Sequence, residues 1–170
     1  MPFDDTDLRM CPFCRQHHGL ELECEGQKKS FEKLRQKTEE HKRRSLEEEI
    51  PWPRPDHTLK VWEAHGLQCA VCRGGVALCG YVRVPVGHPA YGKHYDDVDV
   101  RVHGGITFCQ KSPDGFWLGF DCGHCDDWWG LVENGHGMEH PGKIWTVDDV
   151  AKETERMAEQ LAKMGGQLGK

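Results

Sequence analysis

The sequence lacks an apolar run long enough to cross a bilayer, and its polar N-terminal residues lack the pattern of a secretory signal peptide. These absences predict a cytoplasmic protein without a membrane-spanning helix. The chain also lacks an excess of positive charge, since 22 Lys and Arg residues stand against 28 Asp and Glu residues, a net charge of -6. General nucleic-acid binding is therefore not expected, because affinity for phosphates depends on positive charge.

Cysteine, histidine and glycine are abundant, with 9, 11 and 20 copies among 170 residues. In a reducing cytoplasm, so many cysteines indicate metal binding or redox chemistry before disulfides. The length fits one ordinary domain with a small appended module. The glycine content predicts a turn-rich fold rather than a helical bundle. Three Cys-x-x-Cys pairs stand out, namely Cys11/Cys14, Cys69/Cys72 and Cys122/Cys125.

A proline-rich stretch predicts the division of the chain. Residues 1–50 contain the first Cys-x-x-Cys pair and then a charge-dense segment, 28–50, which is typical of a solvated helix. Residues 51–58 include three prolines, which end that helix and indicate an extended linker. Residues 59–170 are predicted to form the core domain.

The segment Cys11-Pro12-Phe13-Cys14 predicts a structural zinc site, because a tight turn brings two thiolates onto one metal. It resembles the opening of phage zinc ribbons of the restriction-alleviation type. The remaining ligands stay open. Cys24 with His17, His18 or His41 would complete a local site, whereas Cys69 and Cys72 would complete a zinc ribbon. Alternatively, Cys69/Cys72 and Cys122/Cys125 would bind a separate zinc ion that cross-links the core.

The core reads as α+β: a small antiparallel sheet packed by a C-terminal helix. Residues 96–108 predict a strand, because valines alternate with polar residues, with Val98, Val100 and Val102 on one face and Asp97, Asp99, Arg101 and His103 on the other. Further expectations are a short helix over 61–67, a strand over 78–86, a hairpin joining 106–109 to 116–121, and a helix that opens at Thr146 with a capping box and stops at Gly165-Gly166.

The predicted hairpin brings two polar segments together, His103-Gly104-Gly105 and Asp121-Cys122-Gly123-His124. Imidazoles and carboxylates supply general bases and cation ligands, a role open to Asp127 as well, and glycine amides receive an oxyanion. The candidate catalytic residues are His103, Asp121 and His124. The candidate ligand-binding residues are Asp99, Gly104, Gly105, Tyr91 and Trp128.

Redox catalysis is disfavoured, although Cys122-Gly123-His124-Cys125 matches the active tetrapeptide of disulfide isomerases. The carboxylates of Asp126 and Asp127 follow directly, and negative charge raises a thiol pKa rather than lowering it. No thioredoxin-like βαβ pattern precedes the motif.

The core, over about residues 67–161, resembles a family of uncharacterised small proteins encoded by bacteriophages and prophages. The resemblance is carried by Gly80-Tyr81-Val82-Arg83-Val84-Pro85, Gly87-His88-Pro89, Tyr91-Gly92-Lys93, Tyr95-Asp96-Asp97, Val102–Phe108 and Gly119-Phe120-Asp121-Cys122 with His124. It implies a phage setting and a shared site at the His-Gly-Gly and Asp-Cys-x-His segments. The family pattern lacks Cys72 and Cys125, so a metal role for them would be particular to this chain.

Two functions are therefore expected. The first is a phage-encoded accessory protein in the host cytoplasm, for example in counter-defence, that binds a small-molecule ligand or a host protein in the polar pocket. The alternative is a small metal-dependent hydrolase or group-transfer enzyme that uses His103, Asp121 and His124. The sequence indicates no oligomeric state.

Overall fold

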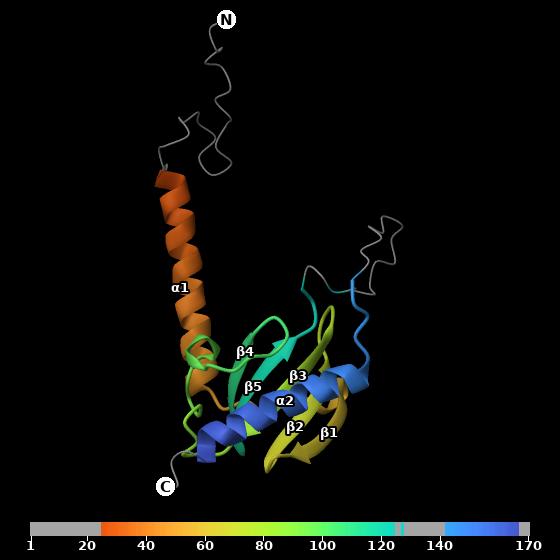
Figure 1. The fold of residues 1–170 in the computed structure, drawn as a ribbon. Coiled ribbons are helices and arrows are strands. Elements are labelled where there is room, and N and C mark those ends of the chain that lie inside the picture. The colour runs from red at the N-terminus through yellow and green to blue at the C-terminus, as the bar shows by residue number, and fades with distance from the viewer. Residues whose placement is uncertain (1–24, 125–126, 128–141, 167–170) are drawn as a thin grey trace, which may run out of the picture. The chain divides into compact units, whose positions relative to one another are not determined.

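The computed structural model describes residues 25–124, 127 and 142–166 (Figure 1). The chain forms two compact units that divide between Arg44 and Ser45. Helix α1 (Glu25–Glu47) belongs to the first unit except for its last turn. Phe31 and Leu34 are 54% and 61% exposed, so the expected solvated, charged helix is confirmed. None of the described helices is long and apolar enough to cross a membrane.

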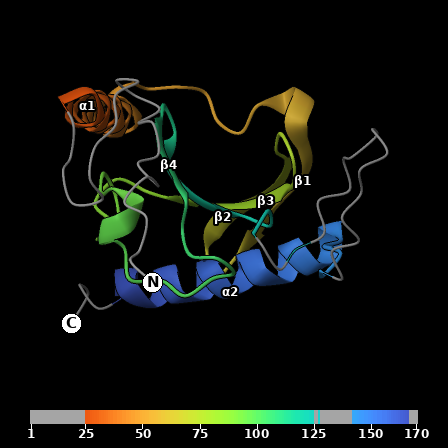
Figure 2. The same cartoon turned by 90° about the horizontal axis from the view of Figure 1, so that it is seen from above.

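The second unit is built on a five-stranded antiparallel sheet with one helix laid across a face, which confirms the α+β prediction (Figures 1 and 2). The strands are β1 (Thr58–Ala64), β2 (Leu67–Arg73), β3 (Leu78–Val84), β4 (Phe108–Ser112) and β5 (Gly115–Asp121), in the order β1-β2-β3-β5-β4. The expected β4–β5 hairpin forms, and it pairs Phe108 with Gly119 and Ser112 with Gly115.

Helix α2 (Val147–Gly166) begins with the predicted capping box. The Thr146 hydroxyl accepts a hydrogen bond from the Asp149 amide (3.2 Å), and the Asp149 carboxylate accepts one from the Thr146 amide (3.2 Å). The apolar stripe of α2 packs into the main core with Phe116, Leu118 and Phe120 of β5. The buried helix positions are Val150, Ala151, Thr154, Met157, Ala158 and Leu161.

The other face of the sheet carries a second, smaller cluster of side chains: Ala70, Cys72, Cys79, Tyr81 and Trp117. Trp52 covers this cluster, with its ring centroid 5.2 Å from that of Tyr81 and 4.7 Å from that of Phe108. Trp52 thus packs the proline-rich residues 51–58 against the sheet at this point, and they include a short 3-10 helix, η1 (Pro55–His57).

The predicted helix over 61–67 is wrong, because these residues form the end of β1, the turn and the first residue of β2. His65 and Gly66 have φ angles of 53° and 75°, and two successive positive φ values are what a two-residue hairpin of this twist requires. Gly66 therefore marks a turn between strands and not the end of a helix.

The predicted strand over 96–108 is also wrong, except at its last residue. The segment opens with a 3-10 helix, η2 (Tyr95–Asp97), and β4 begins only at Phe108. Val98 and Val100 are buried, so the alternation reported burial correctly. The backbone partners come from α2, however: the Gln160 side chain bonds the amide and the carbonyl of Arg101 (both 2.9 Å). Side chains of α2 thus supply the hydrogen bonds that a neighbouring strand would otherwise make to this backbone.

The residues that follow α1 cover the outer edge of β4. The Ile50 amide donates to the Lys111 carbonyl (3.0 Å), and the Gln110 side chain donates to the Glu48 carbonyl (2.8 Å). Lys111 also pairs with Glu49 at 3.0 Å. Just before this segment, Ser45 in the last turn of α1 lies within hydrogen-bonding distance of the buried Cys109 thiol.

Candidate metal centre

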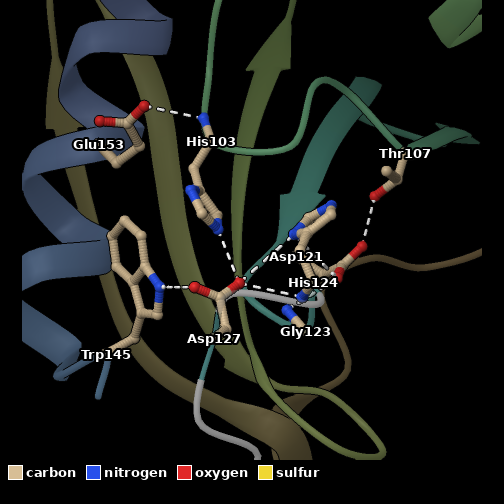
Figure 3. Close-up of polar contacts among 8 residues, drawn as sticks. All are labelled: His103, Thr107, Asp121, Gly123, His124, Asp127, Trp145 and Glu153. Carbon is tan, nitrogen blue, oxygen red and sulfur yellow. Dashed lines mark hydrogen bonds and ion pairs between the residues drawn. The ribbon is translucent and has the colours of Figure 1, made fainter. Parts of the chain in front are cut away.

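The end of β5 and the loop before β4 bring polar side chains together beside the start of α2 (Figure 3). The Cys122 amide donates to the Leu78 carbonyl (3.0 Å), which extends the β3–β5 pairing past Asp121 and fixes where the chain leaves the sheet. His124 follows immediately. His103 approaches from the loop, where its amide donates to Glu153 of α2 (2.9 Å).

Asp127 is the centre of this group. Its side chain is 1% exposed, and one carboxylate oxygen, Oδ2, accepts hydrogen bonds from His103 Nε2 (2.7 Å) and from the His124 amide (2.9 Å). The other oxygen, Oδ1, accepts from Trp145 Nε1 (2.7 Å). Burial opposes ionisation, but these three hydrogen bonds outweigh it and hold the pKa of Asp127 below its usual value. Since a carboxylate only accepts, His103 Nε2 is the donor of this bond, and a metal ion bound through Nε2 would take the place of that proton.

His103 is held on several sides. Its ring centroid lies 4.6 Å from that of Trp145 and 5.0 Å from that of His124, with the two imidazoles nearly perpendicular (89°). The following glycine lets the second imidazole approach. Gly104 has φ 66°, and a Cβ there would lie 1.9 Å from atoms of the His124 ring. Only glycine meets both conditions, the positive φ and the close approach.

His124 lies between two carboxylates. Its Nδ1 atom is 3.5 Å from Asp127 Oδ2 and 4.0 Å from Asp121 Oδ1. Asp121 is itself fixed by the Thr107 hydroxyl (2.8 Å) and by the Gly123 amide (3.0 Å). Asp121 therefore shapes the loop and adds negative charge beside His124.

His103, His124 and Asp127 form a group that fits a metal ion. One ligand atom from each lies within 4.8 Å of the others. Tetrahedral ligands at 2.0–2.1 Å from zinc are about 3.4 Å apart, and the measured separations of 2.7 and 3.5 Å fall on either side of that value. Two imidazoles with one carboxylate suit zinc and related transition metals. The Trp145 bond to the other carboxylate oxygen is the kind of outer contact that orients a metal ligand.

Of the residues predicted from the sequence, the structure brings His103 and His124 together against Gly104, and Asp121 lies next to them. Gly105 closes the loop through its amide bond to the Val102 carbonyl (3.0 Å). Asp99 is exposed to solvent.

Tyr91, a predicted ligand-binding residue, lies away from this group. Tyr91 packs against Phe116, with ring centroids 5.5 Å apart, and Phe116 lies about 17 Å along β5 from Asp121 at the usual rise per residue. Trp128 lies outside the described residues.

Sequence reasoning included Asp127 among the available acids but did not place it at the centre, and it did not connect Trp145 to the site. The signal for Asp127 was its spacing three residues after His124. That spacing produces a closed turn, in which the Asp127 amide donates to the His124 carbonyl (2.9 Å). Nothing in the sequence links Trp145 to this turn, because the contact depends on how α2 approaches the sheet.

The Cys69/Cys72 pair does not converge on a metal, contrary to the zinc alternatives that used it. The two residues lie three apart on strand β2, so their side chains leave opposite faces of the sheet. Cys69 belongs to the core under α2, and Cys72 belongs to the cluster under Trp52. Burial also raises the thiol pKa of Cys69 to about 12. Cys11, Cys14 and Cys24 lie outside the described residues, so zinc at Cys11/Cys14 stays a prediction.

No protein-family model, curated protein or solved structure matches this chain. The resemblance to phage proteins therefore stays a prediction from the sequence, and the site has to be interpreted from its own geometry.

Proposed function

We propose that the protein binds one divalent ion of the zinc class through His103, His124 and Asp127 and is a small metal-dependent hydrolase. One observation carries the proposal: two imidazoles and an ionised carboxylate lie within 4.8 Å of one another at the end of the sheet. Three protein ligands are typical of catalytic zinc sites, which keep a position for water or substrate, whereas structural sites use four.

The surrounding residues have distinct tasks in this scheme. A divalent ion supplies Lewis acidity and lowers the pKa of a bound water towards neutrality. Asp127 supplies the negative charge, and Trp145 keeps its carboxylate oriented. Asp121, 4.0 Å from His124 Nδ1, is a further carboxylate beside the group and would accept a proton.

Exposure indicates the side from which a substrate would approach. The side chains of His103 and His124 are 27% and 32% exposed, whereas that of Asp127 is 1% exposed. Solvent and substrate would therefore meet the imidazoles, with the carboxylate behind them. The charge of the group suits an ester or phosphoester bond, whose leaving group needs a proton and whose developing charge needs a cation.

A second candidate is a binding module of the phage accessory class, in which a metal only orders the surface. The observation that favours it is that two of the metal-binding residues are hydrogen-bonded to α2 or to the residues just before it. His103 is tied to α2 through Glu153, and Asp127 is tied to Trp145, two residues before the start of α2. An ion in this position would fasten both loops to the helix and stabilise a binding surface without any reaction.

Metal analysis of variants tests the proposal. We expect His103→Ala and His124→Ala each to lose one equivalent of zinc, measured on protein dialysed against trace zinc. His65→Asn is the matched control, because His65 lies in the exposed β1–β2 turn at a positive φ that asparagine tolerates. The double variant Cys11→Ser/Cys14→Ser removes the predicted N-terminal zinc site and should leave this equivalent in place.

Hydrolysis of p-nitrophenyl acetate and bis(p-nitrophenyl) phosphate separates the two candidates. The hydrolase predicts turnover that requires zinc and falls at least a hundredfold in His124→Ala. Unchanged zinc content in both His→Ala variants would refute the metal site. A zinc-loaded protein that hydrolyses neither compound, yet unfolds at lower temperature once zinc is chelated, would favour the binding module.

A further inference from the structure

A second pocket lies on the face of the sheet away from α2. It has a volume of about 250 Å³ and lies between the residues before β1 and the turn from β2 to β3. At roughly 30 Å³ per water, it has room for about eight waters, enough for a phosphate group and part of a small ring. Its lining is Trp52, Arg54, His57, Cys72, Arg73, Gly74, Gly75 and Tyr81.

Positive charge dominates the lining. Arg54, Arg73 and His57 contribute two guanidinium groups and an imidazole, and none of the described carboxylates lines the pocket. Asp56 pairs with His57 (3.2 Å), but within the described part of the chain no carboxylate pairs with either arginine. Four other described arginines, in contrast, are paired with acids: Arg35, Arg43, Arg83 and Arg156.

Two aromatic side chains also line the pocket. These are Trp52 and Tyr81, which lie edge to face, at 70°. Trp52 Nε1 is buried and has no hydrogen-bond partner among the residues that the structure describes. An unpaired buried donor costs stability, so an acceptor supplied by a ligand would relieve that cost.

We propose that this pocket binds the phosphate group of a small phosphorylated ligand. Arg54 and Arg73 would hold the phosphate oxygens, since guanidinium groups match phosphate in charge and geometry. The aromatic side chains would contact a ring attached to the phosphate, which makes a mononucleotide the best-fitting class. The pocket is separate from the metal group, because Cys72 and Tyr81 belong to the cluster on the other face of the sheet from the core under α2.

Calorimetric titration of the full chain at constant ionic strength tests this proposal with three probes. These are inorganic phosphate, adenosine 5′-monophosphate and adenosine. We expect the monophosphate to bind more tightly than phosphate, and adenosine to bind at least tenfold more weakly than the monophosphate. Tight binding of phosphate with no gain from the nucleoside would assign the pocket to the free anion.

Substitutions locate the binding. Arg54→Gln and Arg73→Gln should each weaken the monophosphate about tenfold, the equivalent of one hydrogen bond to a charged group. Trp52→Phe keeps an aromatic ring but removes the unpaired donor, and it should weaken binding by a smaller factor. Lys152→Gln is the control for charge, because it removes one cation from the exposed side of α2. A monophosphate affinity that is unchanged in both arginine variants, or that falls equally in Lys152→Gln, would overturn the proposal.

Discussion

Replacing Asp127 by asparagine tests whether its carboxylate holds the site together. The carboxylate accepts from His103, Trp145 and the His124 amide, at 2.7, 2.7 and 2.9 Å. Asparagine keeps one acceptor oxygen, but its NH2 group must face a donor, which loses one bond to a charged group, worth about 1.5–3 kcal/mol, and weakens the others. We expect Asp127→Asn to lower the free energy of unfolding by about 2–4 kcal/mol, which is roughly 5–15 °C in Tm for this length.

The pH dependence of this loss distinguishes the charge from the shape of the side chain. Because the folded-state pKa of Asp127 is lowered, its contribution is fully present above the unfolded value of about 3.9 and disappears as the pH falls through the folded value. The difference in stability between wild type and Asp127→Asn should therefore be constant from pH 5 to 7 and shrink below about pH 4.

Chemical denaturation of the metal-free protein at pH 7 and at pH 3.5 measures both quantities. Asp99→Asn is the matched control, because it makes the same change on an exposed residue of the segment beside α2, where little effect is expected. Equal stabilities of the Asp127→Asn and Asp99→Asn variants would refute the reasoning, since the network would then add nothing to the fold.

Two further predictions follow from backbone space and from burial. Gly104→Ala should weaken zinc binding at least tenfold in a titration, because its Cβ would displace the His124 ring. Gly105→Ala is the control: Gly105 also has a positive φ, but a Cβ there meets open space, so this variant should show backbone strain without displacing the His124 ring. Buried thiols should resist alkylation: with a thiol pKa of about 12, Cys69 and Cys122 should react with iodoacetamide at pH 8 about a thousandfold more slowly in the folded protein than in urea. Fast labelling of either cysteine in the native protein would contradict the described core.

The elements predicted correctly are those whose signals are local. The β4–β5 hairpin is specified by the turn at Pro113 and by alternating apolar residues, and α2 by its capping box and its apolar stripe. In both cases the sequence signal lies within the element that it predicts, so the prediction does not depend on contacts with other parts of the chain.

The errors arose where a local pattern fits two structures. Alternation over 96–108 reports which side chains are buried, but it does not report whether a strand or a helix supplies the hydrogen bonds. Here Gln160, more than fifty residues later in the chain, supplies them. In the same way, Gly66 ends a strand as readily as a helix, and the choice depends on pairing with β2.

The candidate site was partly predictable for the same reason. Asp121 and His124 are neighbours in the sequence, and the hairpin placed them near His103. The central position of Asp127 follows from three donors that reach it from separate segments, one of them Trp145. No spacing in the sequence encodes that convergence.

The segment that covers β4 has a practical consequence for anyone who wishes to isolate the sheet. A fragment beginning at Pro51 would leave the Lys111 carbonyl and the Gln110 side chain of β4 without their Ile50 and Glu48 partners. Unpaired strand edges recruit other chains, so such a fragment should aggregate. A fragment beginning at Ser45 keeps residues 48–50, which should therefore protect β4 from pairing with other chains.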